Sequence, residues 1–141
     1  MKNLETEDVI DMNKESGAKI GIVIKDTDPR PVQMVKSLIR LILKEGSSVL
    51  ISDEWRRVGI GRQAEVEFLP FRKLVSTSSL ILSLGGDGTV IKIVHALRGK
   101  ETPIVGINFG RFGFLTPFVY SQTFLTWLRS VLKKRTKMNL D

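Results

Sequence analysis

The chain has 141 residues, enough for one compact domain with a hydrophobic core and too few for two ordinary domains. With no cysteine and a single histidine, it can form neither disulfides nor thiolate or histidine-rich metal sites. The net charge is +7, and a basic domain attracts nucleic acid, acidic membranes or nucleotides. The sequence shows no RNP-like aromatic strand, zinc finger or clear recognition helix, so nucleotides are favoured over nucleic acid.

Residues 1–17 are predicted to form a flexible acidic leader that ends at Gly17. This stretch lacks the basic start and apolar middle of a signal peptide. Lys or Arg interrupts every long apolar run in the chain, so no segment reaches the length needed to span a membrane. We therefore expect a cytoplasmic protein that does not bind a membrane.

The first ordered part is predicted to be a strand, a helix and a second strand. Residues 18–24 are apolar and β-branched, which is typical of a buried strand. Asp28 is the expected N-cap of the following helix, with Pro29 at its first position and Gly46 at its end. Residues 47–51 then form a short strand. Such a β-α-β unit requires a right-handed crossover and a parallel sheet.

Residues 52–77 have the least clear pattern. Residues 54–57 are compatible with a helical turn, and residues 66–69 with either a short strand or a packed loop. Several basic side chains in this region could contact phosphates, although a solvated basic surface is the simpler interpretation. These side chains are Arg56, Arg57, Arg62, Arg72 and Lys73.

A glycine-rich turn, Gly85–Thr89, lies between a buried strand at 80–84 and a helix predicted over 90–97. Backbone N–H groups at such a turn, together with the helix N-terminus, favour a bound phosphate. Asp87 would repel that phosphate unless its carboxylate binds a hydroxyl or a metal ion beside it. A loop acid or helix cap is the alternative role for Asp87. Neither a Walker loop nor a G-x-G-x-x-G fingerprint is present.

A strand at 102–108 leads into a second glycine-rich loop at 109–113, and a final amphipathic helix begins near Ser121. This alternation predicts a doubly wound α/β fold, a mostly parallel sheet with helices on both faces. The two glycine-rich loops follow neighbouring strands. Because parallel strands end at one edge of the sheet, we expect both loops on the same rim.

These residues carry a family resemblance. Gly85-Gly86-Asp87-Gly88-Thr89 resembles a motif of the NAD kinases. Diacylglycerol kinases and sphingosine kinases share this motif, and phosphofructokinases share it more loosely. Residues 106–116 resemble the Gly-Ile-Asn-x-Gly-x-x-Gly-Phe-Leu-Thr segment of NAD kinases. The second pattern of lipid kinases, Pro-x-Gly-Thr-x-Asn-Asp, does not occur. The specific match covers residues 80–117 and points to the N-terminal domain of an NAD kinase.

The resemblance implies phosphorylation of the adenosine ribose 2′-hydroxyl of NAD to give NADP, with ATP, or polyphosphate in some members, as donor. Asp87 corresponds to the catalytic base, and Mg²⁺ arrives with ATP instead of occupying a protein metal site. The implied NAD contacts are Asp87, Gly88, Lys92, Phe114 and Leu115. The implied phosphate loop is Gly85, Gly86, Gly88 and Thr89, and the second loop contributes Asn108, Gly110 and Gly113.

Structural roles remain open for several of these residues. Lys92 is otherwise a solvated helix residue, and Phe114 is otherwise a core residue. Asn108 is slightly more suited to bonding the neighbouring loop's backbone than to touching a nucleotide. His95, one turn beyond Lys92, is more suited to a structural role than to the site.

The predicted kinase domain spans residues 18–136, and residues 137–141 resemble the start of a β-rich C-terminal domain that is absent here. NAD kinases use that second domain to hold much of the NAD and to build a homo-oligomer. We therefore expect the isolated chain to bind nucleotide weakly and to be nearly inactive. A related lipid or sugar kinase domain and a non-catalytic nucleotide-sensing domain are the alternative functions.

Overall fold

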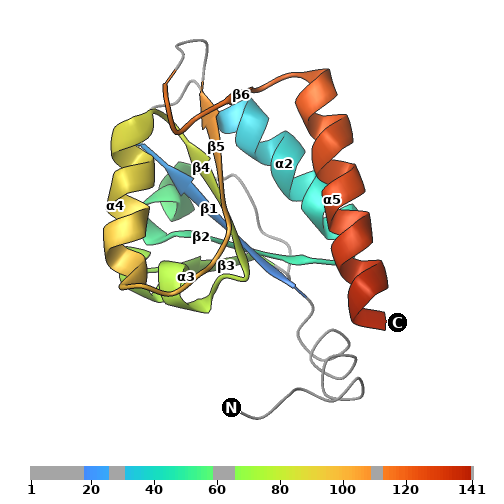
Figure 1. Cartoon of the computed structure of the whole chain (residues 1–141), viewed down its shortest axis with the longest axis horizontal. Coiled ribbons are helices and arrows are strands. Elements are labelled where there is room, and N and C mark those ends of the chain that lie inside the picture. Colours follow the sequence, from blue (N-terminus) through green and yellow to red (C-terminus); the bar gives the residue numbers. More distant parts are fainter. Residues whose placement is uncertain (1–17, 26–30, 59–65, 109–112, 141) are drawn as a thin grey trace.

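The computed structural model describes residues 18–25, 31–58, 66–108 and 113–140. Six strands in this part of the chain form one parallel sheet with the order β3-β2-β1-β4-β5-β6 (Figure 1). The strands are β1 Lys19–Ile24, β2 Ser48–Ser52, β3 Val66–Leu69, β4 Leu80–Leu84, β5 Ile104–Asn108 and β6 Phe118–Val119. The helices are α2 Val32–Lys44, α3 Phe71–Thr77, α4 Asp87–Leu97 and α5 Gln122–Leu140, with a 3₁₀ helix, η1, at Asp53–Val58.

The sheet is doubly wound, as the sequence predicts. From β1 the chain moves outward through β2 to β3, and it then returns to the centre to build β4, β5 and β6 on the other side. Ile24 at the end of β1 is therefore the direct neighbour of Leu84 at the end of β4. Folds of this type bind ligands where the strand order reverses, outside the carboxyl ends of the strands.

Two helical layers cover the sheet. Helices α2 and α5 lie on one face, and α3 and α4 lie on the other (Figure 1). The core on the α2 side is the larger, and its fully buried residues include Ile20, Ile22, Leu38, Ile39, Ile42, Val49, Ile51, Leu82 and Leu84. The core on the α4 side contains Val23, Leu50, Leu74, Val75, Ile81, Ile93 and Leu97. Because the central strands bury both faces, their near-continuous apolar runs are typical of parallel sheets.

Two helices begin at residues other than those predicted. Helix α2 begins at Val32, with Pro31 in the N-cap position, while Asp28 and Pro29 lie outside the described residues. The helix ends at Lys44, and Gly46 follows it with a φ of +86°, which agrees with the prediction that this glycine closes the helix. Helix α4 begins at Asp87, three residues before the predicted start. The second half of the glycine-rich turn is therefore the first turn of a helix.

The region between β2 and β4 contains more regular structure than its sequence indicates. The helical turn near residue 54 is part of η1, and residues 66–69 form β3 and not a packed loop. Helix α3 and the two-residue strand β6 were not predicted. Helix α5 runs to Leu140 and so includes residues 137–140, while the division into domains stays a prediction.

Replacing Trp55 with Ala is expected to lower the free energy of unfolding by about 3–5 kcal/mol. Trp55 lies in η1 and is only 1% exposed, so its removal leaves a large cavity in the core on the α2 side. Urea unfolding followed by circular dichroism measures the change. The exposed neighbour Glu54 supplies a control, because Glu54→Ala should change stability by no more than about 0.5 kcal/mol. Equal effects of the two substitutions would contradict the assigned burial.

None of the helices in the described part of the chain combines the length and the apolar character needed to cross a bilayer.

Candidate active site

Gly85 makes the first sharp turn after β4. Its φ of +154° is one that residues with side chains rarely adopt. A methyl group added here would lie 2.8 Å from Thr89 Oγ1 and 2.9 Å from Lys25 Cβ. The Gly85 N–H also donates a 3.0 Å hydrogen bond to the carbonyl of Ile107, which fixes the turn against β5. Glycine at this position thus lets the loop sit tightly on the rim of the sheet.

The next two glycines face open space. Methyl groups added at Gly86 or Gly88 would meet no atom within 4 Å. A pocket of about 280 Å³ opens here, and it lies at the carboxyl ends of β1 and β4. Its lining residues are Val23, Ile24, Lys25, Gly86, Gly88, Thr89 and Lys92. This glycine-loop pocket is at the lower end of ligand-site volumes, so it suits phosphate groups better than a whole nucleotide.

Two lysines bring positive charge to the glycine-loop pocket. Lys92, which the sequence analysis lists among the NAD contacts, comes from the second turn of α4, and Lys25 comes from the end of β1. Lys25 was missed because no motif surrounds it. Its position directly after the first buried strand was the available signal, because that strand ends on the same rim as the glycine-rich loop.

The carboxylate of Asp87 joins the two glycine-rich loops. The backbone N–H of Phe114 donates to Asp87 Oδ2 at 3.1 Å, and that of Leu115 donates to Oδ1 at 2.9 Å. Asp87 is also the first residue of α4, where a negative charge interacts favourably with the helix dipole. The glycine-rich turn and the described end of the second loop, from Gly113 onward, therefore do share one rim, and the Asp87 side chain links them.

The second loop is built for close contact with Asp87 and β5. A methyl group at Gly113 would collide with Asp87 Oδ1, and one at Gly106 would collide with the carbonyl of Leu115. Asn108 Nδ2 donates to the carbonyl of Thr116 at 2.7 Å. This is the structural role that the sequence analysis favoured for Asn108 over contact with a nucleotide. Gly110 lies outside the described residues.

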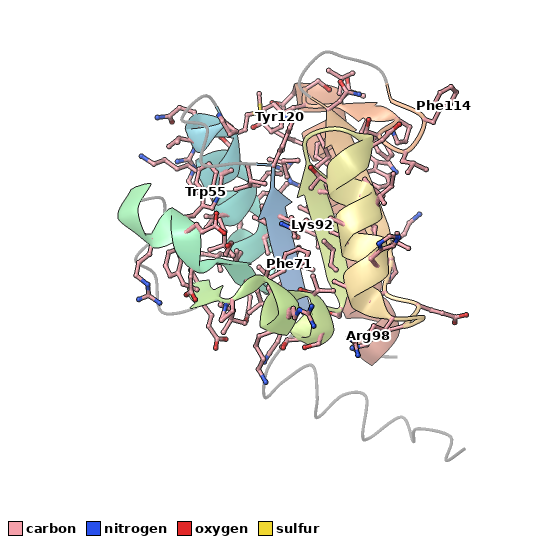
Figure 2. The ribbon with its side chains drawn as sticks, turned by 90° about the vertical axis from the view of Figure 1, so that its left-hand side faces the viewer. Trp55, Phe71, Lys92, Arg98, Phe114 and Tyr120 are labelled. Atoms are coloured by element: carbon pink, nitrogen blue, oxygen red, sulfur yellow. The ribbon has the colours of Figure 1, made fainter. Side chains whose placement is uncertain are left out.

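Phe114 and Leu115 do not line the glycine-loop pocket. Phe114 is 99% exposed and stands away from the ribbon in Figure 2, so the alternative that it belongs to the core is wrong. Leu115 is 45% exposed. Their backbone N–H groups donate hydrogen bonds to Asp87, and their side chains are exposed to solvent.

A buried hydroxyl lies close to the same carboxylate. Thr116 is fully buried, and its Oγ1 has no hydrogen-bond partner in the part of the chain that the structure describes. Thr116 Oγ1 and Asp87 Oδ1 both border the space in which a Gly113 side chain would stand. Across the described residues, no group of three or more His, Asp or Glu side chains could hold a metal ion. Among the described residues of the two loops, Asp87 is the one acidic side chain.

The sequence also matches a known protein family. The ATP-NAD kinase N-terminal domain family matches residues 20–136. The NAD kinase of Methanopyrus kandleri is 34% identical over 97 residues, which cover 69% of this chain and 33% of that protein. The NAD kinase of Christiangramia forsetii is 31% identical over 126 residues, covering 86% of this chain and 42% of the relative. The chain thus spans less than half the length of these curated relatives.

A solved structure supports the fold. The crystal structure of yeast NADH kinase complexed with NADH matches with a TM-score of 0.60 and 16% identity, covering 86% of this chain and 38% of that one. At this identity the match concerns the fold alone. The family match over most of the sequence adds the relationship: this chain belongs to the ATP-NAD kinase family and contains its N-terminal domain.

Proposed function

We propose that the chain is the nucleotide-binding part of an enzyme that transfers a phosphoryl group from ATP to the adenosine ribose 2′-hydroxyl of NAD, giving NADP. The observation that carries this proposal is the position of Asp87. Its carboxylate lies on the rim of the sheet, between a phosphate-sized pocket and a second loop with an exposed aromatic side chain. Phosphoryl transfer needs such alignment of hydroxyl and phosphate more than covalent chemistry.

Asp87 is proposed to orient the ribose hydroxyl and accept its proton. A carboxylate offers about four lone-pair positions, and the N–H groups of Phe114 and Leu115 use one on each oxygen. The remaining positions can accept a hydrogen bond from the hydroxyl. The two backbone bonds also fix the carboxylate in one orientation before the substrate arrives.

The donor phosphates are proposed to lie in the glycine-loop pocket. The first turn of α4 supplies backbone N–H groups, and Lys25 and Lys92 supply positive charge. Mg²⁺ fits this arrangement as an ion carried by the ATP phosphates, because Mg²⁺ sites often use one carboxylate together with substrate phosphates. When bound, it would neutralise charge on the transferred group.

The exposed side chains of Phe114 and Leu115 are proposed to cover part of the dinucleotide. A ring that is almost fully exposed can stack on a base at little cost in protein packing. The yeast neighbour was crystallised as a complex with NADH, and we propose a dinucleotide as the ligand of this chain too. A cytoplasmic location and a homo-oligomeric complete protein remain part of the prediction.

The proposal is tested by incubating the complete protein with NAD, ATP and Mg²⁺ and measuring NADP. We expect NADP to accumulate with the complete protein and hardly at all with the 141-residue chain alone. Phosphorylation of diacylglycerol or sugars in place of NAD would favour the related-kinase alternative. Binding of NAD without turnover by the complete protein would favour a nucleotide-sensing domain.

Lys25→Ala is expected to raise the KM for ATP about threefold to tenfold in the complete protein. The lysine is exposed, so solvent screening limits its contribution to phosphate binding. Steady-state kinetics with varied ATP measure the change. Lys44→Ala is the control, because Lys44 is an exposed residue at the end of α2, on the opposite face of the sheet. An unchanged KM for Lys25→Ala would remove Lys25 from the phosphate site.

A further inference from the structure

A second and larger pocket lies between α3 and α4, on the outer surface of that helical layer. Its volume is about 650 Å³, which is in the usual range for small-molecule sites. Figure 2 shows Lys92 and Phe71 close together, and Arg98 at the lower end of α4. The residues that line this basic groove are Phe71, Arg72, Lys73, Ser76, Lys92, His95, Ala96 and Arg98.

The charge of the basic groove is one-sided. Four of its eight lining residues are Lys or Arg, a fifth is His95, and none is acidic. No ion pair of the described residues involves any of these five side chains. Lys100 adds to the positive charge at the C-terminal end of α3, where its Nζ donates to the carbonyl of Ser76 at 2.7 Å.

Helix dipoles explain only part of this arrangement. His95 and Arg98 lie at the C-terminal end of α4, where positive charge is favourable. Arg72 and Lys73 instead lie in the first turn of α3, which contains no acidic residue. Cations at that end of a helix are unfavourable, because the dipole already places positive charge there. A bound anion would offset this repulsion, because it would attract the Arg72 and Lys73 side chains.

Arg98 adopts a backbone conformation that usually belongs to glycine. Its φ of 51° and ψ of 47° are left-handed, and it is the one non-glycine residue with positive φ in the described part of the chain. Glycine is the common choice at such a helix end, and Arg costs more there. Strained positions of this kind often persist at functional sites. The strain would be offset if the guanidinium contributes to binding.

Lys92 connects the basic groove with the glycine-loop pocket. It is one of the lining residues of both, and its Nζ lies 4.6 Å from the centre of the Phe71 ring. The aromatic ring holds the ammonium group on the side of the groove. An anion in the groove would therefore attract the Lys92 ammonium group, which also lies beside the glycine-loop pocket.

We propose that the basic groove is a second anion site, which binds a compact ligand with two or more phosphate groups. A guanidinium group can bind a phosphate through two parallel N–H···O hydrogen bonds. Arg72 and Arg98 line the groove from different helices. The volume is in the range of small-molecule sites, so we favour a small ligand over an extended polymer. Because Lys92 is shared, occupancy of the groove weakens phosphate binding at the glycine-rich loop.

The test uses tripolyphosphate as the probe and calorimetry on the 141-residue chain. We expect saturable binding that Arg72→Gln/Lys73→Gln weakens about tenfold or more. The matched control is Lys133→Gln/Lys134→Gln, which removes two adjacent exposed cations from α5 and should change the affinity less than about twofold. Equal weakening by the two pairs, or no saturable binding, would overturn the proposal.

A second variant separates binding from folding. Arg98→Gly relieves the left-handed strain, so it should raise the melting temperature while it weakens tripolyphosphate binding. Unchanged binding in this variant would contradict the role of Arg98. ATP added in place of tripolyphosphate shows whether a nucleoside is tolerated, and weaker binding of ATP would point to inorganic condensed phosphate.

Amide chemical shifts locate the probe. Tripolyphosphate in the basic groove should shift the signals of Arg72, Lys73 and Arg98 in proportion to occupancy. Shifts confined to Gly86, Gly88 and Thr89 would place the probe at the glycine-rich loop and overturn the proposal, while leaving the proposed kinase function intact. A short single-stranded oligonucleotide that binds more tightly than tripolyphosphate through the same residues would overturn the assignment to a small anion.

Discussion

Replacing Asp87 with Asn in the complete protein is expected to lower kcat for NADP formation by about 10²- to 10⁴-fold. The amide cannot accept the proton of the ribose hydroxyl. Its single oxygen also satisfies only one of the two N–H groups, of Phe114 and Leu115, that the carboxylate holds now. Because both defects act on the reacting geometry, kcat should fall more than the KM values rise.

A remote acid provides the control for this experiment. Asp53 is an exposed acid in η1, after β2, which β1 separates from β4. Asp53→Asn therefore makes the same chemical change outside the glycine-rich turn and the glycine-loop pocket, and it should leave kcat within about twofold. Circular dichroism of both variants checks that the fold is kept. If Asp87→Asn retained kcat within a few-fold, Asp87 would be a residue that positions the second loop and not the base.

The fold could be predicted largely because its central strands are buried on both faces. Residues 18–24, 80–84 and 102–108 are short apolar runs separated by helical patterns, and such alternation favours a doubly wound sheet. Helix α3 escaped prediction because seven residues are too few to establish a helical period. Strand β6 has two residues, and it depends on tertiary contact with β5 instead of a pattern of its own.

Only part of the candidate site, too, could be predicted from the sequence. Topology alone predicted both glycine-rich loops on one rim, and the hydrogen bonds from Phe114 and Leu115 to Asp87 confirm this for the described end of the second loop. The position of Lys25 directly after the first strand was the available signal, and the register that sets Ile24 beside Leu84 shows how close to the glycine-rich turn that strand ends. The basic groove was also invisible in the sequence, because Arg72 and Arg98 meet only when α3 packs beside α4.

Gly113→Ala is expected to reduce kcat about 10- to 100-fold while the carboxylate of Asp87 is retained. The added methyl group would collide with Asp87 Oδ1 and lie 2.7 Å from Thr116 Oγ1, so the loop must move away from α4. Misplacing a catalytic group by about 1 Å can cost about 10²-fold in rate. Hydrogen exchange of the Phe114 and Leu115 amides should become faster, because their bonds to Asp87 are weakened.

Gly86→Ala is the matched comparison for Gly113→Ala. A methyl group at Gly86 meets no protein atom within 4 Å, but it extends into the glycine-loop pocket. We expect it to raise the KM for ATP and to leave amide exchange at Leu115 unchanged. If the two glycine substitutions gave the same pattern of kcat, KM and exchange, crowding at Asp87 would not explain the effect of Gly113→Ala.

A double-mutant cycle then shows whether Gly113 acts through Asp87. In an Asp87→Ala background the colliding carboxylate is gone, so the methyl group of Gly113→Ala has much less to displace. The two effects on kcat should therefore be far from additive, and the double variant should be about as slow as Asp87→Ala alone. Fully additive effects would mean that Gly113 serves the reaction independently, through the second loop's own contact with the dinucleotide.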